Sequence, residues 1–275
     1  MTEEIKPLEA PKLALYPFQR EDVDRMKDMP NVLLFSECGT GKTCISIEHV
    51  VEQELYPTLV ICPTSLKLNW WDEINRWTGE EAYYCENVEE LVEGYFNNME
   101  KKLQGQKIPN WYILHHEALA YVYEDDPVRT LITRIKWRVV ILDESHRFRN
   151  TNTNRTTTLM SMNKNGTKFI FVSGTPVVNS TFDYFFMLKM IGMVDDEGRF
   201  LEHYVRGRQT QYGFQALGSR NTDELLAKLA PIYIRRTKAE VLKDLPPKTY
   251  QKIRLTMPPD QREVYDHFEE MMVIL

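Results

Sequence analysis

Five short apolar runs recur along the first 172 residues of the chain, and each is rich in β-branched or aromatic side chains. They occupy residues 32–35, 58–62, 111–114, 139–142 and 168–172. None of them alternates polar and apolar positions, which is typical of strands whose two faces are both covered by helices. The runs therefore predict the strands of a buried, mostly parallel sheet.

Amphipathic stretches with helical spacing separate these runs. One of them spans residues 66–77 and places four apolar residues on one face: Leu66, Trp70, Ile74 and Trp77. Ser65 precedes this stretch and is the expected N-cap. Because strands and helices alternate, we predict right-handed crossovers, a doubly wound α/β sheet and ligand sites beyond the carboxyl ends of the strands. We expect the tryptophans in the core rather than stacked on bases.

The pattern changes after residue 192. Gly, Arg, Gln and Tyr dominate as far as Asn221, which predicts an irregular insertion. Beyond it we expect a helix, a short apolar run, a strand and a second helix, at residues 222–229, 232–234, 249–255 and 260–275. These changes divide the chain into an α/β lobe (1–192), an insertion with a basic segment that returns to the lobe (193–257) and the start of a linker (258–275).

Charge is distributed unevenly along the 275 residues, whose formal net charge is −6. Residues 199–254 contain twelve Lys or Arg against five Asp or Glu, so this segment carries +7 and the rest of the chain −13. A basic segment on an acidic body can form a phosphate-binding face, and it can equally be a solvated surface of scattered ion pairs.

Composition argues against several classes of protein. No run of about 18 apolar residues is present, so no membrane-spanning helix is expected. The acidic, polar first residues argue against a signal peptide. Four cysteines without a CxxC pair indicate reduced thiols in a cytoplasmic protein. The sequence His115-His116-Glu117 follows a predicted strand, and we expect structural roles for these residues rather than metal binding.

A glycine-rich loop follows the first apolar run. Its sequence is Ser36-Glu37-Cys38-Gly39-Thr40-Gly41-Lys42-Thr43. Glycines let backbone N–H groups turn toward a phosphate chain, and the helix that follows offers its positive N-terminal end. Lys42 can reach the outer phosphates, and the hydroxyl of Thr43 can hold Mg²⁺. The loop predicts an ATP site, although Ser36 stands where the strict pattern has glycine.

Two carboxylates follow the strand predicted at residues 139–142. Asp143 and Glu144 lie at the mouth of a buried strand, where such groups are costly unless they have a use. Asp143 can hold Mg²⁺ through water, and Glu144 can orient and deprotonate an attacking water. The alternative interpretation is a helix start, where acidic residues are also favoured.

Two shorter segments complete the set of candidate sites. The turn Ser173-Gly174-Thr175 follows the strand predicted at residues 168–172, and its hydroxyls can hydrogen-bond to His146 and sense the nucleotide. Gln19 follows Tyr16-Pro17-Phe18 just before the first helix, and its amide can form two hydrogen bonds with adenine. An exposed residue at a helix start is the alternative interpretation of Gln19.

Taken in order, these segments resemble the N-terminal lobe of the Swi2/Snf2 family of helicase superfamily 2. The matching segments are LYPFQ, ECGTGKT, ICPTSLKLNWWDEINRW, DESHRFRN, SGTPVVN and RRTKAEVLKDLPPK, within residues 13–270. The last segment is specific to the family and is most similar to the branch of annealing helicases and compact bacterial or phage members. The resemblance implies a RecA-like lobe that binds ATP against a second lobe and tracks along duplex DNA.

The resemblance also assigns roles residue by residue. It implies that Gln19 contacts adenine, that Lys42 is catalytic together with Asp143 and Glu144, and that Thr43 and Asp143 hold Mg²⁺. The remaining ATP contacts fall on Gly39, Thr40 and Gly41. Coupling residues are His146, Ser173, Gly174 and Thr175. DNA contacts fall on Pro63, Thr64 and Ser65, and on the basic residues Arg235, Arg236 and Lys238.

The sequence departs from the family pattern in three respects. Ser145 stands where Gly or Ala is usual, and Val178 stands where Gln is common, so the contact made by that amide is not expected. No segment matches the second lobe, which supplies an arginine finger, and the last residues form an apolar helix without a stop signal. We therefore expect a longer natural sequence, and weak ATP binding and slow hydrolysis by this chain alone.

The function implied by the resemblance is an ATPase that depends on double-stranded or branched DNA and couples hydrolysis to movement along it. The cofactors are ATP and Mg²⁺, and the protein is expected to be a monomer in the bacterial or phage-infected cytoplasm, or in a eukaryotic nucleus. A strand-separating helicase of the same superfamily is one alternative. A nucleotide-gated DNA-binding module without turnover is the other.

Overall fold

The computed structural model describes residues 13–148, 150–162, 166–174, 181–211, 213–243, 251–252 and 255–273. The chain forms two compact units, of which the first ends at Leu242 and the second begins at Lys243. Thr175, Val178 and most of the strand predicted at residues 249–255 lie outside the described residues.

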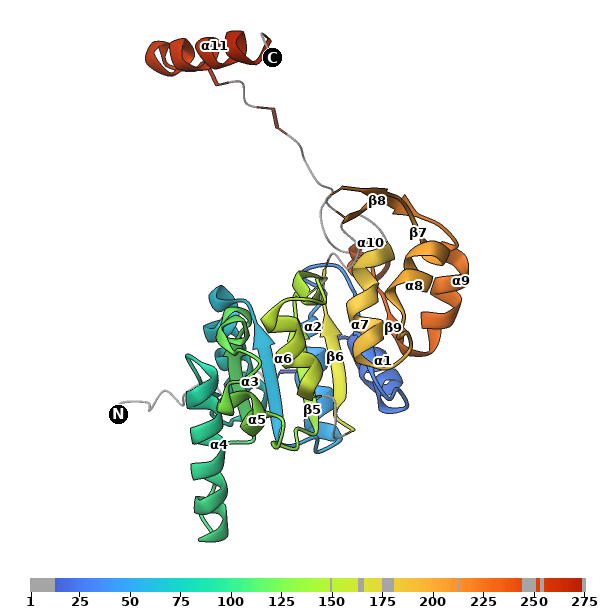
Figure 1. Ribbon diagram of the computed structural model, residues 1–275. Coiled ribbons are helices and arrows are strands. Elements are labelled where there is room, and N and C mark those ends of the chain that lie inside the picture. The colour runs from blue at the N-terminus through green and yellow to red at the C-terminus, as the bar shows by residue number, and fades with distance from the viewer. Residues whose placement is uncertain are drawn as a thin grey trace, which may run out of the picture. The chain divides into compact units, whose positions relative to one another are not determined.

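A seven-stranded sheet forms the centre of the first unit (Figure 1). Its strand order is β3-β4-β2-β5-β6-β1-β9, and all its strand pairs are parallel. The strands are β1 (Val32–Leu34), β2 (Thr58–Cys62), β3 (Tyr83–Tyr84), β4 (Trp111–His115), β5 (Val139–Asp143), β6 (Lys168–Val172) and β9 (Tyr233–Ile234). The five predicted strands are confirmed to within one residue at each end.

Two separate apolar clusters cover the two faces of this sheet. In β5, Val140 and Leu142 belong to one cluster, whereas Val139 and Ile141 belong to the other. Successive side chains of a strand point to opposite faces, so the division follows directly from the strand geometry. The doubly covered α/β fold predicted from unbroken apolar runs is therefore confirmed.

Helices connect the strands and supply the two covering layers. They are α1 (Pro17–Lys27), α2 (Lys42–Glu52), α3 (Lys67–Thr78), α4 (Val88–Leu103), α5 (Pro127–Ile132), α6 (Asn154–Ser161) and α7 (Phe185–Met190). Trp70 and Ile74 of α3 are buried, as predicted. The prediction that Ser65 caps α3 is wrong, because residues 64–66 form a 3-10 turn after Pro63 and Leu66 becomes the N-cap.

The prediction of an irregular insertion up to Asn221 is also wrong. This region contains α8 (Glu197–Tyr204) and an antiparallel hairpin of β7 (Val205–Thr210) and β8 (Gly213–Ser219). It leads into α9 (Thr222–Leu229), which matches the predicted helix. Polar composition was misleading here because one face of an isolated hairpin can remain in solvent.

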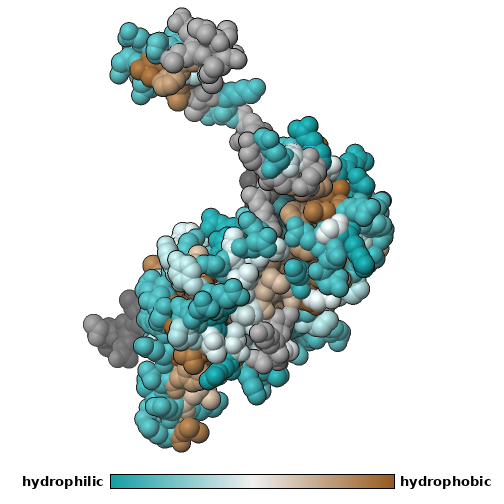
Figure 2. Space-filling model, viewed as in Figure 1, coloured by the Kyte–Doolittle hydropathy of each residue, from teal (hydrophilic) through white to brown (hydrophobic). Residues whose placement is uncertain are grey.

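Two α-helices lie in the described residues that follow β9. α10 (Lys238–Val241) follows β9 in the first unit, and α11 (Pro259–Val273) lies in the second unit. Figure 2 shows a mostly hydrophilic surface on the viewed face of the molecule. None of the helices within the described ranges is long and apolar enough to cross a membrane.

Candidate nucleotide site

The glycine-rich loop lies between the end of β1 and the start of α2. Gly39 and Gly41 have φ angles of +82° and +84°, in the left-handed region that favours glycine. A Cβ atom at Gly41 would lie 2.2 Å from Nε2 of Gln19, so a side chain there would displace the Gln19 amide. Gly41 is the N-cap of α2, and Lys42 is its first residue. The loop therefore places Lys42 and Thr43 at the positive end of a helix.

The conformation of this loop is fixed by hydrogen bonds from both sides. The Thr40 hydroxyl donates to the carbonyl of Glu37 at 2.8 Å, so this side chain holds the loop. Gln19 donates from Nε2 to the carbonyl of Thr40 at 3.0 Å and accepts from the Tyr16 N–H at 2.8 Å. Gln19 is buried, and its amide positions the loop. Its contact with adenine stays a prediction.

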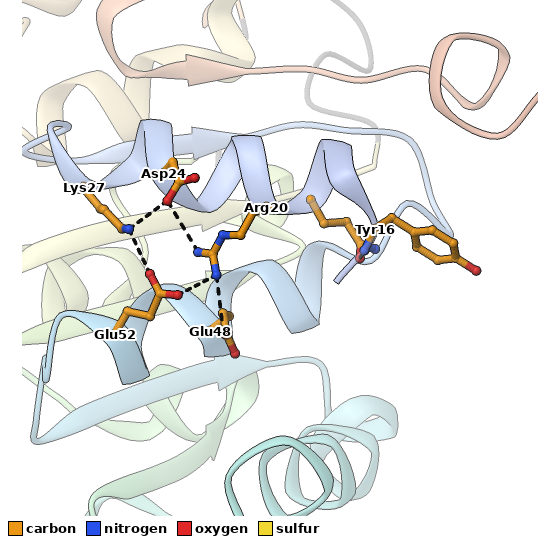
Figure 3. Close-up of polar contacts among 7 residues, drawn as sticks. Tyr16, Arg20, Asp24, Lys27, Glu48 and Glu52 are labelled. Carbon is orange, nitrogen blue, oxygen red and sulfur yellow. Dashed lines mark hydrogen bonds and ion pairs between the residues drawn. The ribbon is translucent and has the colours of Figure 1, made fainter. Parts of the chain in front are cut away.

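Ion pairs tie the helix that carries Gln19 to the helix that follows the loop (Figure 3). Arg20 of α1 pairs with Glu48 of α2 at 3.6 Å and also with Glu52. Lys27, the last residue of α1, pairs with Glu52 at 3.0 Å. Tyr16 points away from this cluster in Figure 3. The network fixes α1 against α2, the helix that follows the glycine-rich loop.

Asp143 is the last residue of β5 and is buried, with 7% of its surface exposed. Trp70 donates its indole N–H to one carboxylate oxygen at 2.9 Å, and the Glu144 backbone N–H donates to the other at 2.9 Å. Burial raises the pKa of Asp143, and the hydrogen bond from Trp70 opposes that rise. The sequence predicted a core role for Trp70 but not this contact. A hydrogen-bonded indole inside a core is common, so the spacing alone carried no signal for it.

Glu144 has a φ angle of +48°, unusual for a residue with a side chain. Its carboxylate lies 3.2 Å from Nδ1 of His146 and accepts a hydrogen bond from the Ser173 hydroxyl at 3.5 Å. His146 Nδ1 and the Ser173 hydroxyl are 3.1 Å apart, so the predicted hydrogen bond between them is present. The turn at the end of β6 and the acidic turn after β5 are therefore linked directly.

Lys42 lies between the glycine-rich loop and the two carboxylates. Its ammonium donates to the carbonyl of Glu37 at 3.2 Å, and it would lie 3.6 Å from a Cβ atom at Gly174. Burial lowers the pKa of Lys42, and the charges of Asp143 and Glu144 oppose that fall. The three predicted catalytic residues therefore meet at one edge of the sheet.

The basic segment after β9 runs along the same loop. Phe35 donates its backbone N–H to the carbonyl of Ile234, and Glu37 donates to the carbonyl of Arg236. The Arg236 backbone N–H donates to the buried hydroxyl of Ser36 at 3.0 Å. Ser36 therefore supplies a hydrogen bond that the usual glycine lacks, and this connection was not foreseen from the sequence.

The side chains of this basic segment differ from the predicted DNA-binding set. Arg236 donates from Nε and Nη2 to Asp22 at 3.0 and 2.8 Å, an ion pair that anchors β9 to α1. The Lys238 ammonium would lie 3.5 Å from a Cβ atom at Gly39, so it faces the glycine-rich loop. Arg235 alone of the three is exposed. The geometry favours structural and nucleotide-site roles for Arg236 and Lys238 over DNA contact.

The other predicted DNA contacts lie at the carboxyl end of β2. Pro63 is buried, whereas Thr64 and Ser65 are exposed. Thr64 donates its hydroxyl to Glu117 at 3.0 Å. His115, at the end of β4, accepts the Ala118 N–H at 3.1 Å and so caps a 3-10 turn, consistent with the structural role expected for it.

The residues present fit a magnesium-bound nucleoside triphosphate. Mg²⁺ in such sites takes one or two protein oxygens together with phosphate oxygens and water, and Thr43 and Asp143 are ligands of that kind. Two glycines with positive φ, a helix start and Lys42 suit a phosphate chain. Burial disfavours the charged form of the Asp143 carboxyl, so a nearby cation would stabilise it.

A parallel sheet with a glycine-rich loop after β1 and an acidic pair after β5 defines a RecA-like P-loop lobe. The family model of the SNF2-related domain matches residues 22–275, and the chain belongs to that family. The predicted Swi2/Snf2 resemblance is thereby confirmed, and the family supports the predicted class of enzyme, an ATP hydrolase.

Relatives and solved structures agree with this family. The chain is 28% identical to the human DNA annealing helicase and endonuclease ZRANB3 over 95% of its own length and 24% of the relative. It is 26% identical to the zebrafish DNA repair and recombination protein RAD54-like, over 92% of this chain and 37% of that one. The Sulfolobus solfataricus SWI2/SNF2 ATPase core in complex with dsDNA superimposes with a TM-score of 0.61 at 20% identity, over 86% and 47% of the two chains. The chain thus spans 24% and 37% of these two relatives and about half of the solved ATPase core.

Proposed function

We propose that this chain is the ATP-binding lobe of a DNA-dependent ATPase that couples hydrolysis to movement along double-stranded DNA. The observation that carries the proposal is that Lys42 lies beside Gly174, whose neighbour Ser173 hydrogen-bonds to Glu144 next to Asp143, at one edge of the sheet. Family membership supports it, as do relatives described as a DNA annealing helicase and a DNA repair protein.

Each residue of the site has a chemical task in this proposal. A bound Mg²⁺ would neutralise charge on the phosphates, with Thr43 and Asp143 as its protein ligands. Lys42 would balance the outer phosphate charge, and Trp70 keeps the Asp143 carboxylate in place. Glu144 would accept the proton of the attacking water. His146 and Ser173 contact the Glu144 carboxylate, and a change at this carboxylate would pass through them to the turn after β6.

The same proposal places a second cation at the phosphates. Lys238 faces Gly39 from the start of α10. We infer that its ammonium contacts the nucleotide phosphates rather than DNA. Thr64 and Ser65, with exposed Arg235, remain the candidates for contacts with the DNA backbone.

The partners are proposed on the same basis. A second RecA-like lobe would close over the nucleotide and supply an arginine, and lobe closure would move the DNA-contacting loops along one strand. The protein would act as a monomer on duplex or branched DNA, in the cytoplasm of a bacterial or phage-infected cell or in a nucleus.

Nucleotide binding tests the site without depending on turnover. We expect the chain to bind a fluorescent ATP analogue with Mg²⁺, and Lys42→Ala to weaken that binding at least about tenfold by removing a phosphate charge. Lys101→Ala, an exposed lysine on α4, is the control and should leave binding unchanged. Equal binding by the Lys42 variant and the unaltered chain would overturn the site.

Turnover distinguishes a motor lobe from a binding module. Glu144→Gln should lower ATP hydrolysis by about 10²- to 10⁴-fold while nucleotide binding persists, because the proton acceptor is lost. Glu124→Gln, at an exposed position, serves as the matched control. Hydrolysis is measured with duplex, single-stranded and forked DNA. Stimulation by single strands alone would favour a strand-separating helicase, and a Glu144 variant that keeps its function without hydrolysis would favour a binding module.

A further inference from the structure

The β7–β8 hairpin lies in a stretch of the chain without acidic residues. Between Glu202 and Asp223 there is no Asp or Glu, although these two types make up 40 of the 275 residues. Three arginines fall within the stretch, Arg206, Arg208 and Arg220, and all are exposed. Within the described parts of the chain, none of the three forms an ion pair with a carboxylate. The hairpin therefore carries uncompensated positive charge on an otherwise acidic protein.

The strand register places two of these arginines on one face. Arg208 is opposite Gln215 and donates from Nε to its side-chain oxygen at 3.1 Å. Arg206 lies two residues earlier on the same strand, so it points to the same face. The irregularity in the register adds its extra residue to β8 and leaves β7 regular. Arg220 instead donates to the carbonyl of Glu202, which anchors the base of the hairpin.

The opposite face of the hairpin is attached to the lobe. Val205 is buried, and Ala216 packs against the main apolar cluster. Phe214 lies across Gly207 within the hairpin itself, where a Cβ atom would come 2.3 Å from its ring, so Val205 and Ala216 are the residues that attach this face to the lobe. Because one face is fixed by these contacts, the Arg206 and Arg208 face is presented to solvent in a defined orientation.

We propose that the solvent face of the β7–β8 hairpin, through Arg206 and Arg208, contacts the phosphate backbone of double-stranded DNA. The proposal rests on the proposed function and adds a contact to it. Arginine presents paired donors that match phosphate oxygens, and a two-stranded ribbon fits the width of a major groove. Figure 1 shows the hairpin at the same end of the lobe as α10, whose Lys238 faces the nucleotide loop.

Duplex DNA is favoured over a single strand by the composition of this face. Single strands are held mainly by stacking bases on aromatic side chains. Thr210, Gly213 and Gln215 share the strand face of Arg206 and Arg208, and none of these five residues is aromatic, whereas Phe214, 38% exposed, lies on the other face. Phosphate contact without stacking is the mode by which proteins hold a duplex irrespective of its sequence.

Salt dependence of DNA binding is the test. Fluorescence anisotropy of a labelled 30-base-pair duplex is measured with the unaltered chain and with Arg206→Gln/Arg208→Gln, from about 50 to 200 mM KCl. We expect the slope of log K against log salt to fall in magnitude by about 2, since each lost phosphate contact removes about 0.9. Arg206→Lys/Arg208→Lys keeps both charges and should retain most of the slope.

Matched controls separate this contact from a loss of net charge or of folding. Lys101→Gln/Lys102→Gln removes the same charge at exposed positions on α4, and its slope should equal that of the unaltered chain. Melting temperature and ATP-analogue binding should be the same in all variants. A slope unchanged in the arginine double variant would overturn the hairpin contact and leave the proposed function standing. Absence of duplex binding by the unaltered chain would overturn both. If the arginine double variant lost as much salt slope with a single strand of the same length, the face would be a general polyanion site, and the duplex assignment would be contradicted.

Discussion

The glycine-rich loop and the β7–β8 hairpin are both proposed to bind phosphate, but the charges of the loop are partly buried and those of the hairpin are exposed. At the loop, Lys42 is partly desolvated, and a side chain at Gly41 would displace the Gln19 amide. At the hairpin, Arg206 and Arg208 stand in solvent. A desolvated charge in a fixed backbone recognises one geometry and is weakly screened, whereas an exposed charge attracts any phosphate and is strongly screened by salt.

In the proposed function, one chain recognises the nucleotide at a rigid site and attaches to DNA at an exposed one. A nucleotide must be held in a single orientation for hydrolysis, which requires rigid surroundings. A motor must release and rebind DNA at every step, which suits exposed charges of modest strength. Substitutions in the two regions should therefore affect different measurements.

The largest effect is expected at the buried region. Gly41→Ala should weaken ATP-analogue binding by about 100-fold or more, because a side chain is strained at this positive φ and would displace the Gln19 amide that holds Thr40. Gly79→Ala is the control, since Gly79 also has a positive φ but nothing lies within 4 Å of its Cβ position. It should cost about 1 kcal/mol of stability and leave binding intact. Similar ATP-analogue binding by the two variants would show that the loop tolerates a side chain at position 41.

Acid should destabilise the sheet region and leave the hairpin arginines charged. Burial, with help from the charge of Lys168, lowers the pKa of His49 to about 3. The unfolded chain binds the proton near pH 6.5, so stability is complete above that pH and is lost as pH falls toward 3. The expected loss at pH 5 is about 2 kcal/mol from His49. Urea unfolding at pH 7.5 and 5 should show this difference, and His49→Gln should reduce it.

The smallest effect distinguishes Lys238 from the two hairpin arginines, Arg206 and Arg208. Lys238→Gln should weaken ATP-analogue binding by about tenfold, the loss of one phosphate contact, and leave the salt slope for duplex DNA unchanged. Arg206→Gln/Arg208→Gln should do the reverse. If Lys238→Gln changed DNA binding and not nucleotide binding, the DNA-contacting role first expected for Lys238 would be restored.

Local sequence determined the elements of the lobe. Unbroken apolar runs identified five of the seven strands, and the glycines at 39 and 41 identified the loop because few other residues accept its backbone conformation. The two short strands, β3 and β9, were missed because two residues carry too little periodicity to be recognised. The hairpin was missed because its polar face resembles a loop.

What the sequence alone decided was the presence of a P-loop lobe of the Swi2/Snf2 type and the residues at the ends of its strands. Only the tertiary structure decided which of these residues touch. It brought Trp70 to Asp143 across 73 positions, Ser36 to Arg236 across 200, and Lys238 to the glycine-rich loop. The physical reason is that strand order and helix packing set such long-range contacts, and no local pattern of residues encodes them.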